Sequence, residues 1–184
     1  MKIILFKILI IFSHMFVKSQ VMDIINPMEK VGLSNWSIVN DDVMGGISTS
    51  FLSLNDENNL IFNGNLSLEN NGGFASSRMV IADKNLTGVK SIKIKFKGDG
   101  NIYKLRLNQT NRRVSYSCDF KSKKDKWDEI NISITDFKPT WRGYTYNDYP
   151  PVDLDKINSL GLQISDKQEG KFELEIQYIK ALYK

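Results

Sequence analysis

The chain has 184 residues, of which 41% are hydrophobic and 25% charged, and its formal net charge is +4. This composition is typical of one globular domain that is long enough to bury a full core. The single cysteine, Cys118, excludes an intrachain disulfide and a multi-thiolate metal site. The single histidine, His14, lies near the N-terminus, so a chain processed after it has no histidine-based triad or imidazole metal site.

Residues 1–19 are expected to form a signal peptide. A short basic start precedes a nearly continuous apolar run over residues 3–17, and Ser19 suits signal-peptidase cleavage. A membrane anchor is the alternative, but the run is shorter than the roughly 20 residues that a spanning helix requires. Cleavage removes three lysines and lowers the net charge from +4 to +1, so we expect no nucleic-acid partner. We expect residues 20–184 to be a single exported domain, periplasmic or extracellular, without a membrane span.

The first half of this domain is predicted to consist of short strands and polar turns. Residues 21–25 form an edge strand or a helical turn, which Pro27 interrupts. Residues 36–48 run from a strand into a structured polar loop and out into a second strand. Further strands are predicted at residues 47–54, 60–68 and 74–81. Turns are predicted at residues 55–59, with no residue to bury, and at residues 69–73.

The second half shows clearer alternation of apolar and polar residues. Residues 91–97 place apolar side chains on one face and a row of three lysines on the other, which we interpret as a solvated face. In the last strand Phe172, Leu174, Ile176 and Tyr178 are expected to face inward, and Glu175 outward. Further strands are predicted at residues 103–107, 114–120, 130–134 and 160–164, with a helical turn at 153–159.

This period-two pattern predicts an all-β fold. Turns occur at short spacing and long segments of helical period are absent, as in an antiparallel sandwich or jelly roll. A parallel doubly wound sheet would instead show continuous apolar runs with helices between them. We expect a mostly antiparallel jelly-roll β-sandwich with at most one or two short helices.

A set of short motifs and single residues recurs in one known family. They are Trp36, residues 40–48 (NDDVMGGIS), 62–64 (FNG), 71–75 (NGGFA), 98–100 (GDG), Tyr103, Arg106, Trp127, residues 136–137, 142–143, 160–168 (LGLQISDKQ), Gly170 and Phe172. Together these segments, which cover nearly all of the chain after the expected leader, resemble the complex I intermediate-associated protein 30 family. The resemblance implies a galactose-binding-like jelly roll and a non-catalytic role, since mitochondrial members of the family act as assembly chaperones for respiratory complex I.

The densest polar cluster is formed by Asn40, Asp41 and Asp42. In a loop these side chains would offer oxygen ligands to a cation. Alternatively, Asn40 and Asp41 cap the turn through backbone hydrogen bonds, with the glycine pair at 45–46 at positive φ. We favour the capping interpretation and expect no resident metal or cofactor. Met44 is expected to fill the core.

Residues 138–146 are predicted to form an aromatic, basic loop at one end of the sandwich. Trp141, Arg142 and Tyr144 are binding candidates, because Trp and Arg anchor protein contacts and an exposed aromatic ring stacks on a sugar face. The alternative is that Trp141 closes the end of the core and Arg142 pairs with Asp136.

Arg78 and Arg106 lie within predicted strands and are the remaining binding candidates. If their side chains face inward, they need acidic partners, and Asp41 and Asp42 are the nearest candidates by type. This pairing would join the two strands to the polar loop.

Three other side chains are assigned to the core rather than to a site. Trp36 and Trp127 are expected to be buried, and Cys118 is interpreted as a small buried apolar residue because no histidine would activate its thiol.

Three functions follow from these residues. The first is a non-catalytic, exported assembly or interaction domain that binds a protein through the Trp141 loop. The second is a carbohydrate-binding module. The third, a carboxylate-only glycosidase, ranks last because adjacent acids do not span the roughly 5–10 Å between its two carboxylates.

Overall fold

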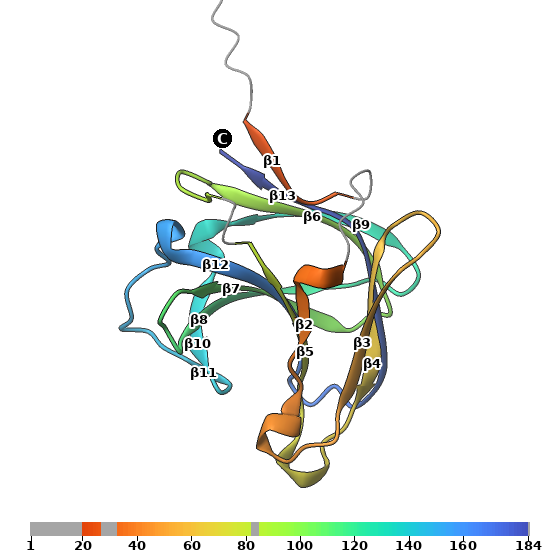
Figure 1. Cartoon of the computed structure of the whole chain (residues 1–184). Coiled ribbons are helices and arrows are strands. Elements are labelled where there is room, and N and C mark those ends of the chain that lie inside the picture. Colours follow the sequence, from red (N-terminus) through yellow and green to blue (C-terminus); the bar gives the residue numbers. More distant parts are fainter. Residues whose placement is uncertain (1–19, 27–32, 82–84, 184) are drawn as a thin grey trace, which may run out of the picture.

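The fold is described from a computed structural model, which places residues 20–26, 33–81 and 85–183 (Figure 1). The expected signal peptide at residues 1–19, including His14, lies outside these residues, so its prediction stays untested. In the described part of the chain, no helix is long and apolar enough to span a bilayer.

One sheet has six strands in the order β3-β4-β13-β6-β9, with β1 paired to β13. Every pairing in it is antiparallel, and β13 lies at its centre between β4 and β6 (Figure 1). The strands are β1 (Val21–Ile25), β3 (Thr49–Leu54), β4 (Leu60–Leu66), β6 (Ser91–Gly98), β9 (Trp127–Ser133) and β13 (Gly170–Leu182).

The other sheet has seven strands in the order β11-β10-β8-β7-β12-β5-β2. These pairings are antiparallel as well, and β12 lies between β7 and β5. The strands are β2 (Trp36–Ile38), β5 (Ala75–Val80), β7 (Ile102–Gln109), β8 (Ser115–Lys121), β10 (Lys138–Trp141), β11 (Tyr144–Thr145) and β12 (Ile157–Ile164).

The hydrophobic core lies between the two sheets. Phe62 and Phe96 point inward from the six-stranded sheet, Tyr103 and Leu162 point inward from the seven-stranded sheet, and all four are fully buried. Alternate residues of each strand thus bury their apolar side chains against the facing sheet, which is the main favourable contribution to folding. The predicted all-β sandwich is confirmed.

The helical segments of the described residues are 3-10 turns of three or four residues. In η5 the carboxylate of Asp153 caps the turn by accepting a hydrogen bond from the backbone N of Asp155 at 3.3 Å. The helical turn predicted at residues 153–159 is therefore present but shorter, because β12 begins at Ile157. The turns are η1 (Leu33–Asn35), η2 (Asp41–Met44), η3 (Glu69–Asn71), η4 (Ile134–Asp136) and η5 (Leu154–Lys156).

The inward position predicted for Tyr178 is wrong. The register between β13 and β6 shifts between Ile176 and Tyr178, which is a β-bulge. The extra residue reverses the alternation, so Ile179 is buried in the core while the hydroxyl of Tyr178 donates a hydrogen bond to Glu129.

The predicted turn at residues 55–59 also differs from expectation, because it buries Asn59 and covers Glu175. Both Asn55 and Asn59 donate side-chain hydrogen bonds of 2.8 Å to Glu175, and Lys97 forms an ion pair with it at 2.5 Å. Glu175 points away from the core as predicted, yet it is buried beneath the turn. Burial raises its pKa, but the hydrogen bonds from Lys97 and Asn59 outweigh this and lower the pKa overall.

Two of the residues assigned to the core are less buried than predicted. Trp127 is 40% exposed, since it begins β9 on the outer face of the six-stranded sheet, where Lys97 lies over its ring. Cys118 is half-buried, and burial raises the pKa of its thiol. Trp36 packs partly buried against the core.

Candidate functional site

Asp41 is fully buried at the start of η2 and joins two loops that are distant in sequence. Its carboxylate accepts hydrogen bonds from the backbone N and the hydroxyl of Ser48, at 2.9 and 2.6 Å. It also accepts backbone hydrogen bonds from Gly73 and Phe74, at 2.6 and 3.2 Å. The loop between β2 and β3 is thereby tied to the loop between β4 and β5, two segments singled out in the sequence.

Asn40 extends this network along the strands. Its side-chain oxygen accepts hydrogen bonds from the hydroxyl of Ser50 at 2.7 Å and from the backbone N of Ser76 at 3.2 Å. Asp41 makes the backbone hydrogen bonds of the capping interpretation, both in its own loop and to the neighbouring one. Asn40 does not cap η2, because its side chain bonds β3 and β5 instead. Among the described residues, no group of three or more acidic, histidine or cysteine side chains is placed to hold a metal ion.

The four donors explain the ionisation of Asp41. Burial raises the pKa of its carboxyl, but the hydrogen bonds from Ser48, Gly73 and Phe74 favour the charged form more strongly and lower the pKa below its ordinary value of 3.8. The carboxylate therefore stays ionised as an internal acceptor, with its oxygens already occupied.

The two glycines of the loop are required for different reasons. Gly45 has a φ of +91°, as predicted. Gly46 does not have the positive φ predicted for it. Instead, a Cβ atom at Gly46 would lie 2.5 Å from Oδ1 of Asp41, so the buried carboxylate itself excludes a side chain there.

The tip of the same loop is exposed. Asp42 points to solvent, and Val43, Met44 and Ile47 are 67%, 51% and 50% exposed. The prediction that Met44 fills the core is wrong, because η2 lies outside the sandwich and turns this side chain outward. The loop thus has a buried polar base and an apolar tip.

Trp141, Arg142 and Tyr144 lie on a β-hairpin rather than on the predicted loop. Thr140 and Trp141 of β10 pair with Thr145 and Tyr144 of β11, respectively. Arg142 and Gly143 both have positive φ, 50° and 80°, which is the conformation of a tight hairpin turn.

The side chains of this hairpin are available for contacts. Tyr144 is 76% exposed, and the guanidinium carbon of Arg142 lies 4.9 Å from the centroid of the Trp141 ring. Trp141 is half-buried but is not part of the core, and Arg142 stacks on it instead of pairing with Asp136. Of the two alternatives for this segment, the geometry favours exposure at the edge of the seven-stranded sheet.

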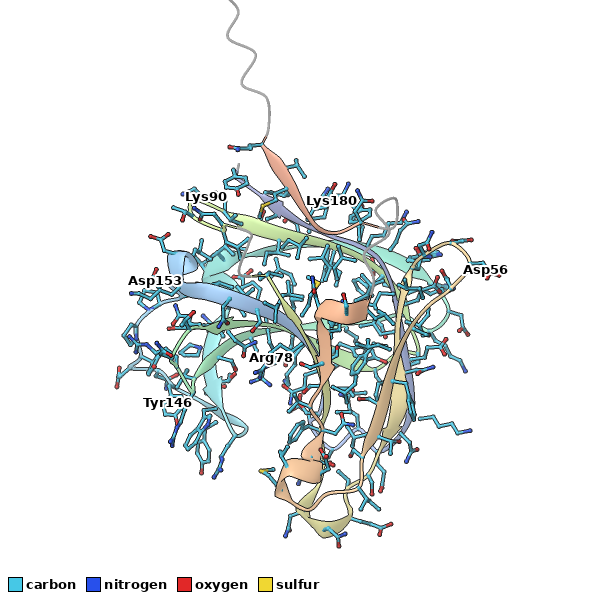
Figure 2. The ribbon with its side chains drawn as sticks, viewed as in Figure 1. Asp56, Arg78, Lys90, Tyr146, Asp153 and Lys180 are labelled. Carbon is cyan, nitrogen blue, oxygen red and sulfur yellow. The ribbon has the colours of Figure 1, made fainter. Side chains whose placement is uncertain are left out.

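Arg78 and Arg106 lie on the outer face of the seven-stranded sheet, so the inward orientation on which the expected pairing with Asp41 or Asp42 depended is not found. Both arginines are aligned with Gly161 of β12, one from each side. Arg106 donates hydrogen bonds to Gln163, at 2.9 Å, and to the hydroxyl of Ser115. Figure 2 shows Arg78 pointing away from the core. The residues on either side of each arginine are buried, and adjacent residues of a strand point to opposite faces, so the arginines face outward.

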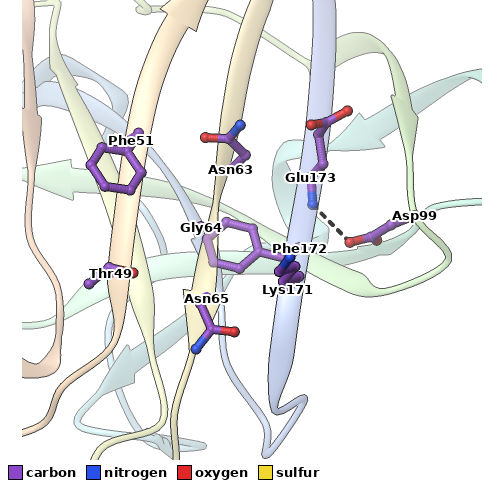
Figure 3. Close-up of a pocket in the computed structure, with 9 residues that line it drawn as sticks. All are labelled: Thr49, Phe51, Asn63, Gly64, Asn65, Asp99, Lys171, Phe172 and Glu173. Carbon is purple, nitrogen blue, oxygen red and sulfur yellow. Dashed lines mark hydrogen bonds between the residues drawn. The ribbon is translucent and has the colours of Figure 1, made fainter.

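A surface hollow of 480 Å³ lies on the six-stranded sheet, where sequence reasoning assigned no site. Phe51, 64% exposed, forms one wall, and Asn63 and Glu173 follow it on the two neighbouring strands (Figure 3). Asp99 accepts a hydrogen bond of 2.9 Å from the backbone N of Glu173 at the far side. The sequence signal for this site is that Phe51 and Leu52 are adjacent in one strand and so point to opposite faces. Because Leu52 packs against the core, Phe51 must lie on the outer face.

Gly64 shapes the floor of this hollow. A Cβ atom at Gly64 would lie 2.8 Å from the Cα of Ser50 and 2.9 Å from Cζ of Phe172, so no larger residue fits between these strands. An exposed aromatic ring flanked by amide and carboxylate groups can stack on the apolar face of a sugar ring and hydrogen-bond its hydroxyls.

The chain is similar in sequence to one described protein family and to individual proteins of known sequence. Residues 25–176 match the protein family described as "Complex I intermediate-associated protein 30". The mitochondrial complex I intermediate-associated protein 30 of Mus musculus is 27% identical over 174 residues, with 82% of this chain and 53% of the mouse protein covered. The chain therefore spans about half the length of that relative. An uncharacterized protein of Schizosaccharomyces pombe is 29% identical over 168 residues, with 79% and 77% covered.

Solved structures of the same fold include carbohydrate-binding modules. The family 11 module of a cellulosomal cellulase of Clostridium thermocellum has a TM-score of 0.64 at 17% identity, with 90% of this chain and 94% of the module covered. A family 29 module complexed with mannohexaose has a TM-score of 0.58 at 10% identity, with 91% and 94% covered. At these identities the likeness shows the fold alone, and it confirms the predicted jelly roll.

Proposed function

The chain belongs to the complex I intermediate-associated protein 30 family, and from this premise we propose that it is a non-catalytic domain that binds a protein partner in the manner of an assembly factor. The observation that carries the proposal is the exposed β10–β11 hairpin. Its Trp141, Arg142 and Tyr144 are of the residue types that anchor protein interfaces, and they project beyond the core.

The partner is proposed to lie outside the cytoplasm. The apolar segment at residues 3–17 supports export to the periplasm or the extracellular space, as a cleaved leader. Detection of the processed chain, beginning after Ser19, in the exported fraction would support this location, and a chain that keeps its leader in the cytoplasm would contradict it.

A pull-down from native membranes tests the protein-binding proposal. The full chain, a Trp141→Ala variant and a Trp127→Ala variant are compared as baits. Trp127 is the matched control, because it is a part-exposed tryptophan on the opposite sheet. We expect a partner that is recovered by the wild type and by Trp127→Ala but lost with Trp141→Ala. Failure to recover any partner that depends on Trp141 and Arg142 contradicts the proposal.

A second candidate function, carbohydrate binding, is supported by the hollow around Phe51. The fold shared with carbohydrate-binding modules agrees with it but does not identify a ligand. The wild type and the variants Phe51→Ala and Tyr144→Ala are screened on a glycan array, and hits are measured by calorimetry. Binding to a neutral glycan that is lost only with Phe51→Ala supports this function, and the absence of any glycan hit contradicts it.

A further inference from the structure

Arg78 and Arg106 form a pair of cations on the outer face of the seven-stranded sheet, separated by one strand. Because both are aligned with Gly161 in antiparallel pairings, all three residues face the same side. Leu160 and Leu162, the neighbours of Gly161, are buried in the core, so this shared side is the outer one. Figure 2 shows the side chain of Arg78 extending from it.

Gly161 leaves the position between the two arginines without a side chain. A Cβ atom there would lie 3.7 Å from Cβ of Arg106 and 4.0 Å from the side-chain nitrogen of Asn108. These two side chains therefore border the position from the β7 side. On the β5 side the nearest atom is the backbone oxygen of Ser77, at 3.0 Å, and Arg78 is the residue in register with Gly161. The backbone of β12 forms its floor.

The charge of Arg106 is not compensated within the described chain. Its two hydrogen-bond acceptors, Gln163 and Ser115, are neutral, and its Nε atom is buried without a partner. Burial, followed by the positive charge of Arg78, lowers the pKa of Arg106 to about 10. A buried charge without a counter-ion is costly, so proteins normally pair such groups with acids.

The rest of this face adds positive charge. Among the described residues the guanidinium group of Arg78 has neither a hydrogen bond nor an ion pair, and the same holds for the side-chain amine of Lys138 at the β10 end of the same row. The acids near the face, Asp119 and Asp166, are both bound to Lys104, at 2.8 and 2.6 Å. An anion bound between the arginines would meet no free carboxylate beside it.

The groups around the two arginines are hydroxyls and amides rather than apolar side chains. Ser115, Ser117, Thr140, Asn108 and Gln163 share the face with the arginines. Such groups hydrogen-bond sugar hydroxyls, whereas the centre of a protein interface is rich in aromatic and apolar residues. The composition of the face therefore favours a saccharide over a protein segment.

We propose that the outer face of the seven-stranded sheet, between Arg78 and Arg106, binds a saccharide that carries a carboxylate. The carboxylate lies over Gly161, where the planar guanidinium groups reach it from both sides. The half-buried side chains of Asn108, Thr140 and Gln163 contact the sugar hydroxyls, whereas Ser115 and Ser117 are buried and hydrogen-bond within the fold. This site is on the opposite sheet from the Phe51 hollow and does not use the side chains of Trp141, Arg142 or Tyr144, so it stands independently of the functions proposed above.

Calorimetric titration of the processed chain tests this site with four probes: a short oligogalacturonate, the same oligomer with its carboxylates methyl-esterified, inorganic phosphate and polyglutamate. We expect binding to the free oligogalacturonate and none to the ester, in which each carboxylate is replaced by a neutral methyl ester. Arg78→Gln is the main variant, because an exposed side chain without partners can be removed without affecting folding. It should weaken binding by about tenfold to a hundredfold.

Lys95→Gln on the six-stranded sheet is the matched control for loss of one positive charge and should leave the affinity unchanged. Arg106→Lys keeps the charge but loses the planar fork, so it should weaken binding while the melting temperature stays unchanged. The proposal is overturned if the oligogalacturonate does not bind, if the ester binds equally well, or if Arg78→Gln binds like the wild type. The assignment to a saccharide is overturned if polyglutamate binds more tightly than the oligogalacturonate and this binding depends on Arg78. It is also overturned if phosphate is the only probe that binds.

Discussion

Asp41 and Arg106 are both shielded charges at positions that the sequence marked as candidate sites, yet their surroundings are opposite. Asp41 accepts four hydrogen bonds from Ser48, Gly73 and Phe74, so its charge is satisfied entirely within the fold. Arg106 has two neutral acceptors and another cation beside it. The comparison teaches that a buried charge supports the structure when the chain supplies its partners, and is available to a ligand when the chain does not.

The largest expected effect is on the Asp41 side of this comparison. Asp41→Ala leaves four donors without their acceptor, so we expect the free energy of unfolding to fall by about 3–5 kcal/mol. Asp42→Ala is the control, because this neighbouring carboxyl is exposed, and it should change stability by less than about 0.5 kcal/mol. Chemical denaturation measures both, and equal effects would show that the network does not hold the loops.

The glycine pair beside Asp41 gives the next largest effect. Gly46→Ala places a methyl group against the buried carboxylate and should cost about 2–3 kcal/mol. Gly45→Ala meets no atom within 4 Å but keeps a left-handed φ, so it should cost about 1 kcal/mol. The order of the two melting temperatures checks this. A reversed order would mean that backbone conformation, not the carboxylate, limits this loop.

The ionisation of Asp41 predicts a pH dependence of stability. Since its folded-state pKa is lowered below 3.8, the charged form stabilises the fold fully above the unfolded-state pKa, and this contribution is lost as the pH falls through the folded-state value. Acid denaturation of the wild type and Asp41→Asn measures it. The variant, which has no carboxyl to titrate, should show a shallower loss of stability below about pH 4. Parallel curves would contradict the prediction.

The smallest effect is expected on the Arg106 side. Arg106→Gln removes a shielded cation that has no acidic partner among the described residues. The free energy lost with its hydrogen bonds should therefore be largely offset by the free energy gained when a charge is no longer shielded from water. We expect the free energy of unfolding to change by less than about 1 kcal/mol in either direction. A loss as large as that of Asp41→Ala, measured in the same denaturation series, would show that Arg106 is a structural residue and would remove the contrast.

The sequence was sufficient for the fold because period-two alternation is a local property. Each strand shows which of its faces is apolar, and that pattern was sufficient to predict an all-β sandwich. It failed at Tyr178, where a bulge inserts one residue and inverts the faces. It also failed at Glu175, where a turn that reads as purely polar folds over a strand and buries a carboxylate.

The candidate sites were identified by residue type but not by their partners. Asn40 and Asp41 were assigned to capping, while Ser48, Gly73 and Phe74 were not recognised as the donors to Asp41. Arg78 and Arg106 were expected to meet acids and instead flank a glycine. Phe51 was counted as one more apolar residue of its strand, although its position on the outer face exposes it.

By itself the sequence determined an antiparallel β-sandwich of a recognisable family, with a polar loop near residue 41 and without a histidine in residues 20–184. Only the tertiary structure decided which of the described charged groups have compensating partners within the fold and which do not. The reason is that alternation depends on neighbours along the chain, whereas the partners of Asp41 and the alignment of Arg78, Gly161 and Arg106 depend on strand order and register.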